Sequence, residues 1–152
     1  MTASAMDNMA EAFEHAVSEY PHEACGILLG KPDTEEDDAL FKCTNIQNKM
    51  HEMYPETFTR DARTAYYIDP KELLQIFKKA EAEGLAVKMF YHSHPDHGAY
   101  FSDEDEKMAL FDGEPVYPDA RYMVISVYNK VVKDKAVFEW NSETKTFERG
   151  SF

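Results

Sequence analysis

The chain has 152 residues and a mass of 17.5 kDa, which suits one compact domain over residues 1–152 and is too short for two. Its formal charge of −13 argues against a nucleic-acid partner, because the positive footprint that phosphates require is missing. No apolar run approaches the roughly 20 residues of a membrane span, and no secretory leader opens the chain, so we expect no membrane association and a cytoplasmic location.

The N-terminal part predicts a helix followed by a β-hairpin. Apolar residues recur at helical spacing over about 7–19, and Pro21 stops the pattern. Apolar runs over 24–30 and 39–46 flank a charged tip, which is typical of two antiparallel strands. The segment 57–68 is plausibly extended, either as an ordinary sheet strand or as an edge on which an extended substrate pairs.

A second helix is signalled at both of its ends. Asp69 can cap it, Pro70 suits its first turn, Glu72 can complete a capping box, and Gly84 ends it. Further segments are expected as strands (85–94, 121–129, 135–141 and a short one at 145–150) and as a helix (102–111). Helices before, between and after strands predict an α/β or α+β fold with a mixed sheet.

Three side chains near the end of the strand 85–94 suggest a metal site. His92 and His94 lie on the same face of a strand, because alternate side chains share a face. Asp105 follows on the first turn of the next predicted helix, where a carboxylate is favoured. Two imidazoles and one carboxylate leave the fourth position of a tetrahedral Zn²⁺ open for water, as in catalytic zinc sites. Taken alone, Asp105 after Ser102 also fits an ordinary helix N-terminus.

Hydrolysis at such a site also needs a general base. Glu23 is the best candidate, since it lies where the first helix gives way to an apolar strand and has no basic neighbour to neutralise it except His22. His22 is the rival base. His97 needs no role in the site, and Cys25 and Cys43 are expected to be reduced core residues.

The combination of "HEACGILLG" with "HSHP", a serine separated from the second histidine by seven residues, and an aspartate three residues after that serine resembles the JAMM/MPN+ (JAB domain) metalloprotease family. The resemblance implies a mixed β-sheet sandwiched between α-helices, layered as in cytidine deaminases. It implies one Zn²⁺ per chain held by His92, His94 and Asp105, with Glu23 as general acid and base and Ser102 bonding the tetrahedral intermediate.

The resemblance also implies a substrate, namely the amide or isopeptide bond after the C-terminal Gly-Gly tail of a ubiquitin-like or sulfur-carrier protein. Compact prokaryotic relatives include peptidases that release cysteine from such a carrier. Many of them have prolines where this chain has "GAYF", so the substrate subclass stays open. Tyr100 and Phe101 could line a groove for the tail or pack in the core. A non-catalytic scaffold is the alternative from another class, and a zinc deaminase is disfavoured because its cysteine motif is absent.

Overall fold

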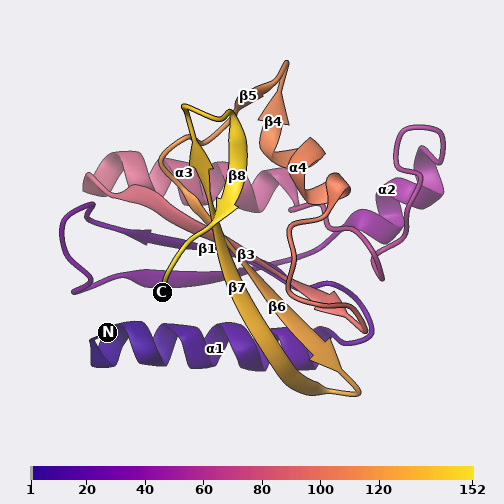
Figure 1. Ribbon diagram of the computed structural model, residues 1–152, viewed down its shortest axis with the longest axis horizontal. Helices are drawn as coiled ribbons and strands as arrows, with labels where there is room; N and C mark the ends of the chain where they lie inside the picture. The colour runs from indigo at the N-terminus through magenta and orange to yellow at the C-terminus, as the bar shows by residue number, and fades with distance from the viewer. Residues whose placement is uncertain (1) are drawn as a thin grey trace.

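The computed structural model describes residues 2–152 and places helices on both faces of one large sheet (Figure 1). The helices are α1 (Ala3–Glu19), α2 (Gln47–Met53), α3 (Pro70–Glu83) and α4 (Asp103–Ala109). The strands are β1 (Cys25–Gly30), β2 (Ala39–Cys43), β3 (Ala86–Pro95), β4 (Leu110–Phe111), β5 (Glu114–Pro115), β6 (Arg121–Tyr128), β7 (Val131–Asn141) and β8 (Thr146–Arg149). None of the helices within residues 2–152 has the length and apolar character needed to cross a membrane.

Six strands lie side by side in the order β2, β1, β3, β6, β7, β8, and β4 and β5 form a separate small hairpin. Within the large sheet, β3 and β6 are parallel and all other neighbours are antiparallel. The predicted mixed sheet and the α+β class are therefore confirmed. The centre of the sheet is β3, the strand that carries both candidate histidines.

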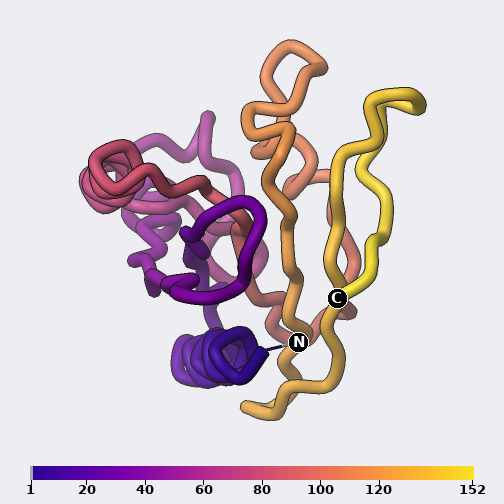
Figure 2. The backbone as a smooth tube through the Cα atoms, turned by 90° about the vertical axis from the view of Figure 1, so that its left-hand side faces the viewer, coloured from indigo at the N-terminus to yellow at the C-terminus, as the bar shows by residue number. Residues whose placement is uncertain are grey.

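Alternation along β3 separates two apolar cores on opposite faces of the sheet. Tyr91 packs with Ala12 and Ala16 of α1 on one face. Phe90 belongs to the other cluster, which includes Ile76 of α3. In Figure 2, α1 and α3 are seen nearly end-on, with the hairpin of β1 and β2 between them. His92 and His94 alternate with Tyr91 along β3 and so point to the same face as Phe90, which is the face opposite α1.

The ends of α3 agree with the sequence except at one residue. The Asp69 side chain accepts a hydrogen bond from Lys71 N, and Gly84 ends the helix in the left-handed conformation with φ 66°. The predicted capping box is wrong, because Glu72 accepts a hydrogen bond from Thr44 N at 3.1 Å instead. This contact ties the start of α3 to the end of β2.

The expectation of an extended segment over 57–68 is also wrong. The only ladder contact there is an isolated bridge between Asn45 and Ile68, and α2 precedes it where no helix was predicted. Side chains satisfy the backbone instead: Asn45 Oδ1 accepts from Tyr67 N, and Asn48 Oδ1 accepts from Ala62 N at 2.7 Å. With no strand in this segment, it offers no sheet edge for a substrate.

Two other boundaries differ from the sequence prediction. Helix α1 begins at Ala3 rather than near residue 7, since Thr2 accepts a hydrogen bond from Ala5 N as its N-cap. The turn between β6 and β7 is restricted to Asn129 and Lys130, both with positive φ, as in tight hairpins whose twist matches the strands. Strand β8 is present as predicted.

Candidate metal centre

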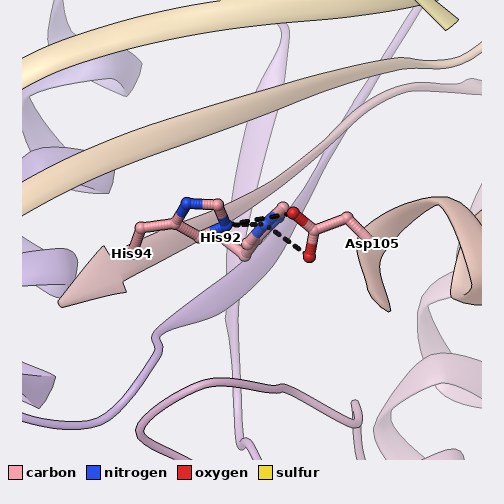
Figure 3. A group of neighbouring side chains, drawn as sticks. All are labelled: His92, His94 and Asp105. Carbon is pink, nitrogen blue, oxygen red and sulfur yellow. Dashed lines mark hydrogen bonds and ion pairs between the residues drawn. The ribbon is translucent and has the colours of Figure 1, made fainter. Parts of the chain in front are cut away.

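The three predicted ligands converge in the structure (Figure 3). His92 Nε2 lies 3.0 Å from Asp105 Oδ1, and His94 Nε2 lies 3.0 Å from Asp105 Oδ2. The two imidazole Nε2 atoms are 3.2 Å apart. All three side chains are at most 4% exposed as residues, so the cluster is enclosed by protein rather than displayed on the surface.

Local structure accounts for how the carboxylate is aimed. Ser102 is the N-cap of α4, and its hydroxyl accepts a hydrogen bond from Asp105 N at 3.1 Å. Ser102 N donates in return to Asp105 Oδ2 at 3.0 Å, which completes a capping box. The helix N-terminus therefore fixes one oxygen of Asp105 and leaves the other directed at His92.

Hydrogen bonding around His94 tests whether these residues fit a cation. His94 Nδ1 lies 2.8 Å from the carbonyl oxygen of Gly98, which can only accept, so Nδ1 carries the proton and Nε2 presents a lone pair. That lone pair faces a carboxylate oxygen of Asp105 at 3.0 Å. In the neutral imidazole this contact joins two acceptors, which is unfavourable until a proton or a metal cation lies between them. The donor set of two nitrogens and one oxygen suits zinc. The candidate ligand atoms are 3.0–3.2 Å apart. Two ligand atoms on one tetrahedral zinc ion are about 3.3 Å apart, so little movement is needed to bind it.

The ionisation states also suit a cation. Burial lowers the pKa of His92, which keeps its imidazole neutral and able to coordinate. Burial alone would raise the pKa of Asp105, but the two histidines outweigh it and hold the pKa of that carboxyl well below its usual range. A neutral imidazole beside a carboxylate anion is the combination that metal binding requires.

Aromatic rings support the two imidazoles. Tyr66, which the sequence analysis did not single out, stacks on His92 with ring centroids 4.6 Å apart and planes inclined by 26°. This stacking matters because His92 Nδ1 is buried and, among the residues that the structure describes, has no hydrogen-bond partner to orient the ring. The Tyr100 ring packs edge-on against the His94 ring, with centroids 5.1 Å apart. Tyr100 is 50% exposed, so it borders the site. Phe101 instead packs among core aromatic rings, including that of Phe138 at 5.4 Å.

Glu23 lies just ahead of β1 and is only 3% exposed. Its backbone is held on both sides, because its N–H donates to Ala62 O at 2.7 Å and its carbonyl accepts from Asn45 Nδ2 at 2.9 Å. Burial, followed by the charge of Asp105, raises the pKa of Glu23 well above its ordinary value, and Arg60 opposes this only in part. Glu23 Oε1 is buried without a partner within residues 2–152, as expected of a carboxyl kept free for chemistry.

The other candidates lie where they contribute less. His22, the rival base, is exposed, and His97 is also exposed in the loop after β3. Cys25 is fully buried opposite His92 in the sheet, and burial raises the pKa of its thiol well above the ordinary value. A thiol in this environment is inert as a nucleophile. Ser93 points away from the site and accepts a hydrogen bond from Ala24 N.

Solved structures share this fold. The solution structure of a protein from Desulfitobacterium hafniense superposes with a TM-score of 0.67 over 95% of this chain and 86% of its own, at 23% sequence identity. A second solution structure, of a protein from Salinibacter ruber, gives a TM-score of 0.60 over the same shares of both chains, at 25% identity.

Curated relatives are similar in sequence as well. Desampylase of Haloferax volcanii is 30% identical over 114 residues, which span 74% of this chain and 73% of the relative. CysO-cysteine peptidase of Mycobacterium tuberculosis is 29% identical over 74% of this chain and 64% of its own length. The probable TtuB-protein conjugate cleaving protease of Thermus thermophilus is 32% identical over 66% of this chain and 58% of its own. Prokaryotic homologs of the JAB domain match over residues 6–142, and the chain belongs to this family.

Proposed function

We propose that this chain is a zinc-dependent peptidase that hydrolyses the amide bond after the C-terminal glycine of a ubiquitin-like protein. The observation that carries the proposal is the convergence of His92, His94 and Asp105 in a buried cluster. Glu23 is buried as well, and its Oε1 has no hydrogen-bond partner within residues 2–152. Similarity to a desampylase, a CysO-cysteine peptidase and a probable TtuB-protein conjugate cleaving protease supports this substrate class.

A zinc ion held by the three ligands would polarise the scissile carbonyl and acidify the attacking water. Glu23 then takes the proton of that water on its free carboxylate oxygen and passes it to the departing amine as the C–N bond breaks. Its raised pKa suits both halves of this transfer, since the group has to accept and release a proton near neutral pH.

Ser102 is proposed to stabilise the oxyanion. Its Oγ already accepts the N–H of Asp105, which leaves the hydroxyl proton free to be donated. A donor aimed at the developing negative charge contributes most in an enclosed site. Of the two predicted tail contacts, Tyr100 is the one that borders the ligands and is exposed, so we assign the substrate groove to Tyr100.

The experiment is incubation of the zinc-loaded protein with each ubiquitin-like protein of its host, extended beyond the C-terminal glycine, with the cut located by mass spectrometry. Cleavage directly after that glycine, lost in the metal-free protein and in Glu23→Gln, is the expected result. Tight binding of a ubiquitin-like protein with full zinc occupancy and no cleavage would instead identify a scaffold and overturn the proposal.

Release of a single amino acid from a sulfur-carrier protein is the second candidate. The similarity to CysO-cysteine peptidase favours it. The two candidates share the reaction and differ only in the group that leaves.

A further inference from the structure

Arg60 is a cation whose hydrogen-bonding capacity is unused. Its closest acidic partner is Glu104, with Nε 3.8 Å from Oε2, which is too far for a hydrogen bond. No acceptor within residues 2–152 takes a hydrogen bond from its guanidinium, and the side chain is 46% exposed. Arg63, three residues later, donates three hydrogen bonds to Asp61 at 2.8–3.4 Å. Arg60 is therefore available to a ligand, and Arg63 is not.

The backbone holds Arg60 at the rim of the metal centre. Its carbonyl oxygen accepts from Nε2 of the buried Gln47 at 2.8 Å. Two residues later, Ala62 O accepts the N–H of Glu23 at 2.7 Å. On its other side, the guanidinium approaches Glu104, the residue before the ligand Asp105. Arg60 thus lies between the segment of the proposed proton donor and the helix that supplies the carboxylate ligand, and its charge lowers the pKa of Glu23.

This position distinguishes between leaving groups. When a single amino acid leaves, its α-carboxylate is one carbon away from the nitrogen that receives the proton. A receptor for that carboxylate must therefore lie near the group that protonates the nitrogen. Arg60 is two residues from Ala62, whose carbonyl binds the Glu23 N–H, and its guanidinium approaches Glu104 next to Asp105. A lysine side chain leaving from an isopeptide carries no carboxylate near its nitrogen. The planar guanidinium binds carboxylates through two parallel hydrogen bonds, which gives both strength and orientation.

We propose that Arg60 binds the free α-carboxylate of a single amino acid attached to the C-terminal glycine of the carrier, and so makes such adducts preferred over isopeptides. The inference rests on the proposed peptidase function and specifies its leaving group. Glu104 acts as a weak internal competitor, because an exposed ion pair at 3.8 Å contributes little and yields readily to a carboxylate in bidentate geometry.

The test compares two substrates that differ only in this charge. A carrier that is cleaved after its terminal glycine is prepared with one added alanine, ending either as the free acid or as the amide. The zinc-loaded wild type should cleave the free acid with a kcat/KM about tenfold to a hundredfold higher, as expected of a charge-assisted pair. Arg60→Gln should bring this ratio close to one, and Arg60→Lys should keep part of it.

Two further variants sharpen the result. Arg63→Gln is the matched control and should retain the wild-type ratio, since Arg63 is committed to Asp61. Glu104→Gln should raise the ratio by removing the competing carboxylate. The ratio is insensitive to changes in the pKa of Glu23 or in zinc content, which affect both substrates alike. Equal cleavage of acid and amide by the wild type, or an unchanged ratio in Arg60→Gln, would overturn this inference alone. Failure to cleave any carrier would remove the peptidase function, and this specificity with it.

Discussion

Replacing Glu23 by glutamine should greatly lower kcat and at the same time stabilise the metal-free fold. The side chain keeps its size but can no longer accept and deliver a proton, a contribution worth about 10²–10⁴-fold in rate. We expect kcat to fall by that factor with zinc still bound, because Glu23 is not among the three converging ligands.

The gain in stability follows from the burial of the carboxyl. Glu23 is 3% exposed, and no group in the described part of the chain bonds its Oε1. A buried unsatisfied group costs about 1–3 kcal/mol, more when charged. Glutamine is still a buried polar side chain but never ionises, so the variant should recover the part of this cost that comes from the charge, about 1 kcal/mol or more near neutral pH. In a chain of this size, 1 kcal/mol corresponds to about 2–4 °C in Tm, so a rise of several degrees is expected near neutral pH.

The effect of pH has a defined sign. Burial raises the pKa of Glu23 above its unfolded value of about 4.3, so below about pH 4 the carboxyl is neutral in both states and wild type and variant should be equally stable. Between that value and the raised pKa, the unfolded chain ionises while the buried carboxyl keeps its proton, so the wild type loses stability that the variant keeps. Above the raised pKa the difference between the two proteins stays constant.

Thermal unfolding of both metal-free proteins, followed by circular dichroism between pH 4 and pH 8, measures this difference. Substitution of the exposed Glu81 by glutamine is the control and should leave Tm unchanged at every pH. Wild-type turnover in Glu23→Gln, or a stability difference that does not grow with pH, would refute the reasoning.

Three other substitutions probe the surroundings of the site. Tyr66→Leu removes the ring stacked on His92 and should weaken zinc binding about tenfold or more in a chelator competition. Tyr66→Phe keeps the ring and should bind zinc as the wild type does. Equal zinc affinities of Tyr66→Leu and the wild type would show that stacking does not orient His92. Ser102→Ala removes the N-cap of α4 and should lower the free energy of unfolding by about 0.5–2 kcal/mol in urea, with Ser102→Thr largely restoring it; no change in Ala would contradict the capping role. Gly26→Ala would place a Cβ against the ring of the buried Tyr91 and should lower the free energy of unfolding in urea by about 1–3 kcal/mol; unchanged stability would show that the ring has room to move.

The ligand set was predictable because its geometry is local. Strand alternation alone puts His92 and His94 on one face, and the helix start alone aims Asp105. The segment before α3 was not predictable in this way. Its backbone is held by side chains such as Asn45, whose Nδ2 donates to Glu23 O and whose Oδ1 accepts from Tyr67 N, 22 residues away in both cases. Such contacts leave no periodic pattern in the sequence, so a strand was expected where a loop exists.

By itself, the sequence determined which atoms can bind a metal, the strand and helix that present them, and the mixed sheet that carries them. Tertiary structure alone decided how far Glu23 is buried, that Tyr66 stacks on His92, that Phe101 packs in the core, and that Arg60 approaches Glu104. The division has a physical cause. Periodicity and capping act between residues a few positions apart, whereas desolvation and stacking depend on which distant segments come to surround a group.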